Sequence, residues 1–239
     1  MIEQWFGSFS LLDLWAVGFF VFAWFAYGIA VEHRDVRRPS LNRMMHRHRY
    51  RWAEQMELRD NRVVDTTINA SLQNGTAFFA STSLIALGSV LTLSRSADDV
   101  LTLFSTLPFG TPTTRAMWEI KVAGLALIFV YAFFKFAWAY RLFNYGAILI
   151  GAVPPRGGDP VEIRRAARRA AAMNVAAGGH FNNGQRAFFF ALAYLGWFVS
   201  AAALLVATAA VLIVMGRRQF ASNARRALQD ADDDDAPDR

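Results

Sequence analysis

The sequence predicts an all-α integral membrane protein, in which four transmembrane helices form a bundle and two further helices connect them on the cytoplasmic side. Two observations support this fold class. Of the 239 residues 54% are hydrophobic and the mean hydropathy is +0.23, a combination that is high for a soluble domain. The apolar residues also gather in long runs, each near the roughly 20 residues that a helix needs to cross a bilayer.

The expected spans follow these runs along the chain and form one domain over residues 1–215. The second run is the shortest and contains several Ser and Thr residues, so we expect its helix to begin earlier, near Asn69. A flexible charged tail is expected over residues 216–239, because they are polar and include an acidic run. The expected spans are residues 11–31, 76–93, 118–150 and 187–215.

The arginines predict how the chain is oriented, because short cytoplasmic loops carry an excess of Arg and Lys. Residues 32–75 contain nine arginines and residues 151–186 contain six, against seven on the other side. We therefore expect a multi-pass protein of the plasma (inner) membrane with both termini outside the cytoplasm. Arg217 and Arg218 conflict with this expectation, since they directly follow the fourth span.

Both arginine-rich connections are expected to be helical. Between about residues 40 and 72, apolar residues recur at helical spacing and Arg and His fill the other face, which predicts an amphipathic helix that lies on the inner headgroups or packs beneath the bundle. Residues 159–180 alternate arginine pairs with alanines, and GGHFNNG is expected to end this helix. Because these arginines adjoin apolar runs, we expect a bilayer with anionic headgroups and no nucleic acid as partner. The expected headgroup ligands are Arg43, Arg47, Arg49, Arg51, Arg164, Arg165, Arg168 and Arg169.

A line of polar side chains is predicted to run from the cytoplasm into the second span, because its members recur at helical intervals. Two interpretations stay open, namely hydrogen bonds between helices and the wall of a water-filled path. Asp65 is the expected counter-charge for Arg62 or for a basic residue of another helix. The line consists of Arg62, Asp65, Asn69, Gln73, Thr76 and Ser83.

The third span carries both lysines of the chain. Lys121 and Lys135 are 14 residues apart, which is close to four helical turns, so they are expected to point in similar directions. For Lys135 two interpretations stay open. Its side chain either reaches the inner headgroups or faces the bundle interior with a bonding partner.

No catalytic, metal or cofactor site is expected. The absence of Cys excludes disulfides, thiolate metal sites and thiol catalysis. Phosphate-binding glycine loops and HExxH motifs are also absent from the sequence. The four histidines are expected near the membrane surface and not at the depth that a membrane haem needs.

Three segments are RDNRVVDTTINASLQNGTAFFASTSLIALG, FKFAWAYRLFNYGAILIGAVP and HFNNGQRAFFFALAYLGWF. In this order they resemble the domain of unknown function 599 family of bacterial and plant membrane proteins. The resemblance covers about residues 10–215 and implies a four-span helical membrane protein with no assigned activity. It adds five residues to the candidate polar network, namely Arg141, Asn144, Asn182, Asn183 and Arg186.

Three functional classes follow from these features. The polar line and the lysines favour a homo-oligomeric channel or a transporter-like protein, which is the leading hypothesis. The arginine-rich helices favour a structural or adaptor protein that binds anionic lipid or a protein partner. A membrane enzyme is the third hypothesis, for which no catalytic residue is identified.

Overall fold

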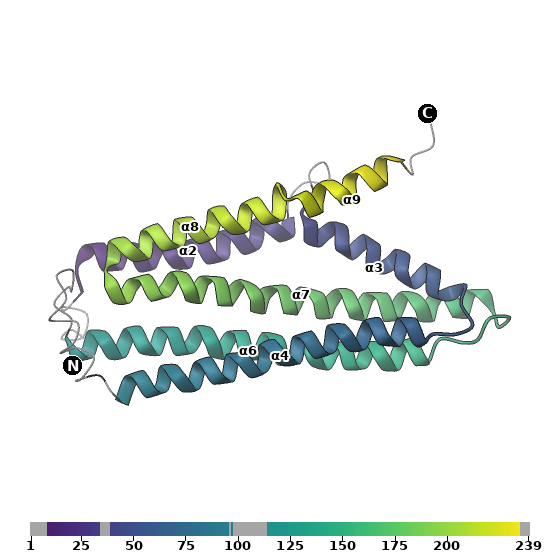
Figure 1. Cartoon of the computed structure of the whole chain (residues 1–239), viewed down its shortest axis with the longest axis horizontal. Helices are drawn as coiled ribbons and strands as arrows, with labels where there is room; N and C mark the ends of the chain where they lie inside the picture. Colours follow the sequence, from purple (N-terminus) through teal and green to yellow (C-terminus); the bar gives the residue numbers. More distant parts are fainter. Residues whose placement is uncertain (1–8, 34–38, 96, 98–113, 235–239) are drawn as a thin grey trace. The chain divides into compact units, whose positions relative to one another are not determined.

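A computed structural model describes residues 9–33, 39–95, 97 and 114–234. In these residues the secondary structure is helical and contains no strand, which confirms the all-α prediction. Four helices, α2, α4, α6 and α8, are long and apolar enough to cross a membrane. The helices in Figure 1 are α2 (Leu11–His33), α3 (Leu41–Glu57), α4 (Val63–Arg95), α6 (Arg115–Gly151), α7 (Pro160–Val199), α8 (Ala201–Phe220) and α9 (Asn223–Asp234).

The chain divides into two compact units. Unit 1 contains Met1–Met45, Val90–Ala126 and Phe189–Arg239, and unit 2 contains His46–Ser89 and Leu127–Phe188. The division falls inside α3, α4, α6 and α7, so each of these helices contributes to both units.

The apolar run 187–215, predicted as one span, is interrupted at Ser200. Ser200 has an extended backbone (φ −166°, ψ 162°), and its side chain accepts a hydrogen bond from the Ala203 N–H, which caps α8. A Cβ on Gly196 would lie 2.8 Å from the Ala203 carbonyl oxygen, so glycine is required where α8 folds back against α7. The prediction of one continuous helix was wrong at this point.

In unit 1, α2 and α8 pack side by side and run in the same direction (Figure 1). Near the start of α2, Asp13 accepts a hydrogen bond from Trp197, which lies in the last turn of α7 just before α8 begins. Near the end of α2, the Tyr27 hydroxyl donates to the Met215 carbonyl at 3.2 Å. On which side of the membrane each terminus lies stays a prediction.

The two basic connections also differ from the predicted boundaries. The predicted helix over residues 40–72 is divided into α3 and α4 by a short turn, in which the Asn61 side chain accepts the Val63 N–H at 2.9 Å and starts α4. The predicted helix 159–180 does not end at GGHFNNG but continues without a break through α7. Two of its glycines instead permit close packing, Gly178 against Arg49 and Gly184 against a phenylalanine ring.

Part of the predicted flexible tail is the helix α9. Its first turn is capped, because the Arg225 N–H donates to the Ser222 hydroxyl at 3.2 Å. The Arg225 guanidinium then donates to Gln229 at 3.0 Å and to the Pro39 carbonyl at 3.2 Å. The described part of the expected tail thus contains a helix, its flexibility stays a prediction, and residues 235–239 lie outside the described residues.

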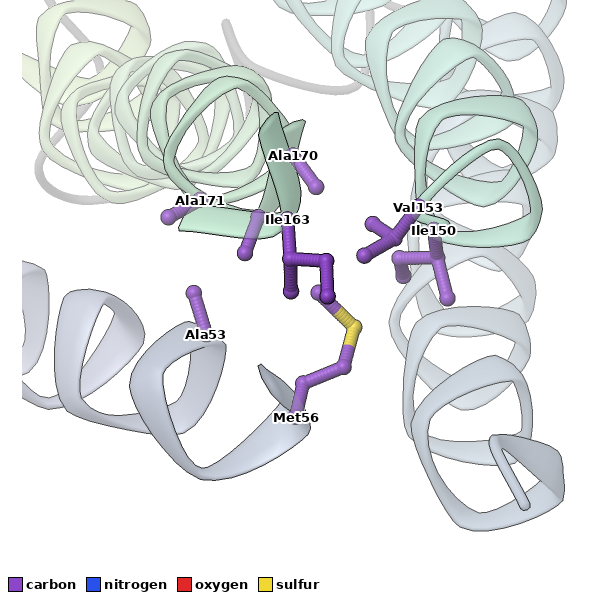
Figure 2. Close-up of a cluster of buried hydrophobic side chains, with 8 residues drawn as sticks. Ala53, Met56, Ile150, Val153, Ile163, Ala170 and Ala171 are labelled. Atoms are coloured by element: carbon purple, nitrogen blue, oxygen red, sulfur yellow. The ribbon is translucent and has the colours of Figure 1, made fainter. Parts of the chain in front are cut away.

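The core of unit 2 is a cluster in which α3 packs on α6 and α7 (Figure 2). Met56 of α3 points toward Ile163 of α7, with Ile150 of α6 and Val153, which follows α6, beside them. Small side chains let the helices approach closely, and truncating a buried Met to Ala usually costs about 2–5 kcal/mol. The buried members are Ala53, Met56, Ile150, Val153, Ile163, Ala167, Ala170 and Ala171.

Candidate functional site

Two buried amide side chains meet at Gly146 of α6 in unit 2. Asn69 of α4 is 0% exposed, and its Nδ2 donates to the Phe143 carbonyl of α6 at 2.9 Å. Asn174 of α7 is 1% exposed, and its Nδ2 donates to the Ala170 carbonyl of its own helix at 3.3 Å. A Cβ on Gly146 would lie 3.2 Å from Asn69 Oδ1 and 3.1 Å from Asn174 Nδ2. The missing side chain of Gly146 therefore leaves room for both amides.

The Oδ1 atoms of Asn69 and Asn174 are both buried without a hydrogen-bond partner. An unpaired buried acceptor usually costs about 1–3 kcal/mol. A cavity of about 10 Å³ adjoins Asn174. Its lining residues are Trp52, Ala53, Met56, Ile150, Ala170, Ala171 and Asn174.

Asp65 connects α4 to α3 and to the turn that follows it. Its buried Oδ1 accepts a hydrogen bond from Trp52 Nε1 at 2.6 Å and one from Arg59 Nη1 at 2.8 Å, the latter an ion pair. Its Oδ2 is buried and unpaired. The counter-charge of Asp65 is thus Arg59, and the expected pair with Arg62 does not form.

Arg62 instead binds the end of α6. Its guanidinium donates to the carbonyls of Val153 and Pro154, the second at 2.6 Å. Both carbonyls directly follow α6, where the helix leaves acceptors without intrahelical partners. Arg62 therefore has a structural role that its positive charge suits, since cations are favourable near a helix C-terminus.

The remainder of the predicted polar line bonds within its own helix. Thr76 and Ser83 are buried, and their hydroxyls donate to the carbonyls one turn earlier, Leu72 and Phe79, both at 2.8 Å. Gln73 is half-buried. The buried side chains of the predicted polar line thus face protein. Most of their polar atoms form hydrogen bonds to α3, to α6 or to the backbone of α4 itself.

Lys121 and Lys135 have different surroundings. Lys121, in unit 1, is 2% exposed and donates to the Trp197 carbonyl at 2.8 Å. Lys135, in unit 2, is half-buried with its Nζ 5.3 Å from the centre of the Tyr131 ring. Burial, with the positive charge of Lys135 as a smaller cause, lowers the pKa of His180.

The five residues added from the family resemblance do not form one group. Arg141 and Asn144 are exposed on α6, and the Arg141 side chain donates to the Tyr145 hydroxyl at 2.6 Å. Asn182, Asn183 and Arg186 are half-buried on α7. The last two bond each other, with Arg186 Nη2 donating to Asn183 Oδ1 at 2.7 Å.

The predicted headgroup arginines are exposed except for Arg49. The Arg49 guanidinium packs on Gly178 of α7, and burial lowers its pKa. Arg164 of α7 forms an ion pair with Glu57 of α3 at 3.8 Å. We call Arg164, Arg165, Arg168 and Arg169 the α7 arginine patch. In the described part of the chain, the last three of these form no ion pair.

Comparison with known proteins identifies the family. A family model described as "Protein of unknown function, DUF599" matches residues 15–224. The chain belongs to this family. No curated protein and no solved structure matches the chain. Together with its apolar helices, membership makes this DUF599 protein an integral membrane protein of unassigned activity.

Sequence reasoning missed the partners that this DUF599 chain uses around Asn69. Asn174 and Gly146 lie on other helices, and nothing local to α4 indicates that they approach it. One signal was present, because Asn174 is a single amide within the otherwise apolar stretch AAAMNVAA. A polar residue in such a stretch is expected to have a specific partner or ligand.

Proposed function

We propose that this protein is a membrane adaptor that presents the α7 arginine patch to an acidic protein segment in the cytoplasm. The observation that carries the proposal is the unbroken length of α7. It has 40 residues, which corresponds to about 60 Å, and the patch lies about 45–55 Å along the helix from its C-terminal end. A bilayer core of about 30 Å with one headgroup layer occupies less than this.

The length of α7 distinguishes two of the expected partners of its arginines, a protein segment in the cytoplasm and the lipid headgroups. If the end of α7 at Ser200 lies at the outer surface, the patch projects past the inner headgroups into the cytoplasm. Three of its four guanidinium groups have no ion pair in the described structure, and guanidinium binds carboxylates through paired hydrogen bonds. Arg43, at the start of α3, remains the better candidate for lipid headgroups because only a short connection separates it from α2.

The proposed orientation places the start of α2 outside and the C-terminal tail inside the cytoplasm. Because α2 and α8 run parallel, α7 crosses the membrane between them as a fifth crossing. The five arginines from the last turn of α8 onward then join fourteen in the two connections, giving nineteen inside and two outside, while Arg186 lies within the crossing part of α7. This distribution follows the positive-inside tendency better than the arrangement with both termini outside.

Binding of a fluorescent decaglutamate peptide tests the adaptor proposal. The protein is placed in nanodiscs of zwitterionic lipid, and anisotropy is measured across a salt series. We expect binding that weakens with salt, falls at least tenfold when the four patch arginines become Gln, and survives their change to Lys. The double variant Arg95→Gln with Arg115→Gln is the matched control and is expected to bind normally.

Two results would overturn the adaptor proposal. One is equal peptide binding by the patch variant and the control variant. The other is an absence of peptide binding combined with a patch-dependent stabilisation by phosphatidylglycerol, which would assign these arginines to lipid.

Transport is the second proposal, and the unpaired buried oxygens of Asn69 and Asn174 favour it over a purely structural role. Proteoliposomes are expected to release a small cation, and Asn69→Leu is expected to reduce the rate. An equal rate in empty liposomes would contradict it.

We also propose self-association in the plasma (inner) membrane, supported by the small side chains Ala207 and Ala210 that α8 leaves partly exposed. Light scattering of the purified protein tests the number of copies.

A further inference from the structure

We infer that unit 2 binds one anionic phospholipid, whose phosphate is held by Arg141 at the end of an exposed apolar face of α6. Arg141 is exposed on this helix, and α6 is long and apolar enough to cross a membrane. Charged side chains in such helices usually face the interior of the bundle, where they are paired. In the described residues Arg141 forms no ion pair with an acidic side chain. Its counter-charge is therefore expected to come from outside the chain.

Contacts within α6 hold the Arg141 guanidinium in a fixed direction. Its Nε donates to the Tyr145 hydroxyl at 2.6 Å, and its central carbon lies 5.5 Å from the centre of the Tyr145 ring. The same carbon lies 5.9 Å from the centre of the Trp138 ring. Among the described residues, no hydrogen bond uses the two terminal nitrogens. These two nitrogens are therefore available to bind a phosphate through paired hydrogen bonds.

A second helix supports this site. The exposed Trp138 ring makes an edge contact with the His180 ring of α7, with the ring centres 6.4 Å apart. Lys135 is near enough to His180 for their charges to interact, and it lies about 9 Å from Arg141 along the axis of α6. Lys135 also forms no ion pair in the part of the chain that is described. Two cations without a carboxylate favour an anionic headgroup over a zwitterionic one.

The lengths of two helices predict that this site lies at the edge of the bilayer core. Arg115 and Glu119 form an exposed ion pair near the start of α6, and Glu119 lies about 33 Å before Arg141 along the helix axis. On α7, His180 lies about 30 Å before Ser200. Both lengths are close to the roughly 30 Å of a bilayer core. Arg141 is thus expected at the level of the phospholipid phosphates.

The exposed face of α6 before Arg141 suits an acyl chain. Leu127, Phe134 and Trp138 are exposed, and their spacing of seven and four residues puts them on one face of the helix. Arg141 follows three residues later on the same face. This face therefore combines apolar surface along the hydrocarbon core with a guanidinium at its end. A phospholipid uses both parts, whereas a soluble anion uses only the guanidinium.

Native mass spectrometry of the purified full-length protein in detergent tests the site. The protein is titrated with phosphatidylglycerol and, in parallel, with phosphatidylcholine that has the same acyl chains. We expect one phosphatidylglycerol per chain to bind at concentrations at which phosphatidylcholine does not. Arg141→Gln is expected to weaken this binding about tenfold or more. Arg115→Gln, an exposed arginine at the other end of α6, is the matched control and is expected to retain it.

Two further variants distinguish an oriented site from general attraction by positive charge. Tyr145→Phe keeps the ring and every charge but removes the acceptor of the Arg141 Nε–H, so it is expected to weaken binding about threefold. The variant with Gln at all four positions of the α7 arginine patch is expected to bind phosphatidylglycerol normally. Because Arg141 and Tyr145 are exposed, their variants are expected to keep the native melting midpoint when no lipid is added.

Four outcomes overturn the inference. Equal binding of the two lipids would remove the preference for an anionic headgroup. Equal binding by Arg141→Gln and Arg115→Gln would mean that the lipid binds elsewhere, and a loss in the α7 arginine patch variant alone would assign it to that patch. Release of phosphatidylglycerol by inorganic phosphate would assign the site to a soluble anion. Peptide binding by the α7 arginine patch is measured separately, so the adaptor proposal and this inference stand or fall independently.

Discussion

Lys121 Nζ donates a hydrogen bond to the carbonyl oxygen of Trp197 at 2.8 Å. Trp197 lies in the last turn of α7, where carbonyls lack intrahelical partners because Ser200 is extended. The ammonium group therefore caps α7, with its charge at the negative end of the helix dipole. Asp13 accepts the Trp197 Nε1–H at 2.8 Å, so a carboxylate is also close. A lysine within an apolar segment is thus explained by the turn between α7 and α8.

Lys121→Met is expected to destabilise the protein by about 1–3 kcal/mol, because the Trp197 carbonyl is left buried and unpaired. Denaturant unfolding in detergent measures the change. Lys135→Met is the control, since Lys135 is half-buried and its Nζ lies over the Tyr131 ring, 5.3 Å from the ring centre. Equal losses in the two variants would contradict the capping role of Lys121.

Arg62→Lys is expected to destabilise unit 2 despite keeping the positive charge. Arg62 donates to two consecutive carbonyls, Val153 and Pro154, and a single ammonium group does not reproduce this forked geometry. We expect a loss of about 1–3 kcal/mol in the free energy of unfolding. Arg165→Lys, on the exposed face of α7, is expected to change the free energy of unfolding little. A loss in Arg165→Lys as large as that in Arg62→Lys would contradict the structural role of the Arg62 guanidinium.

Gly184→Ala and Gly179→Ala are expected to change stability in opposite directions. A Cβ on Gly184 would lie 2.7 Å from the buried ring of Phe136, which also packs against Phe79 and Phe188 and has no room to move. Overpacking of this kind costs about 1–3 kcal/mol. A Cβ on Gly179 meets no neighbour, so the higher helix propensity of Ala stabilises by about 0.5–1 kcal/mol. Melting midpoints that shift in the same direction would contradict this packing.

The lowered pKa of His180 predicts a loss of stability in acid. Burial and the charge of Lys135 favour neutral His180 in the folded protein, so the unfolded chain binds the proton first as the pH falls below about 6.5. We expect the melting midpoint to decrease between pH 7 and pH 5. His180→Asn is expected to make this decrease smaller, and Lys135→Gln is expected to make it slightly smaller. An unchanged pH profile in His180→Asn would show that other groups are responsible.

Hydropathy was sufficient to predict α2, α4 and α6, because a helix that faces lipid must be apolar whatever its neighbours are. It failed at Ser200, since the stretch WFVSAAALL stays apolar through the turn. Lys121, which bonds the Trp197 carbonyl before the break, lies far away in sequence. Gly196 lies four residues before Ser200, but its close approach to Ala203 appears only in the fold.

The candidate site, too, could be predicted from the sequence only in part. Asn69 and Asp65 were predicted as part of a polar line because their spacing on α4 is visible in the sequence. Their partners were not predictable in this way, since the Phe143 carbonyl and Asn174 reach Asn69 only through the packing of three helices.

The side of the membrane on which α8 ends is the most direct test of the account, because the proposed orientation, which is argued from the parallel pair of α2 and α8, has the tail on the same side as the two arginine-rich connections. The natural chain has no Cys, so a single cysteine reports without background. Arg226→Cys is labelled with a membrane-impermeant maleimide in oriented vesicles, with Glu54→Cys on α3 as the inner reference and Arg95→Cys as the outer reference. We expect Arg226→Cys to react only where Glu54→Cys reacts. Reaction together with Arg95→Cys would contradict the turn at Ser200 and the fifth crossing.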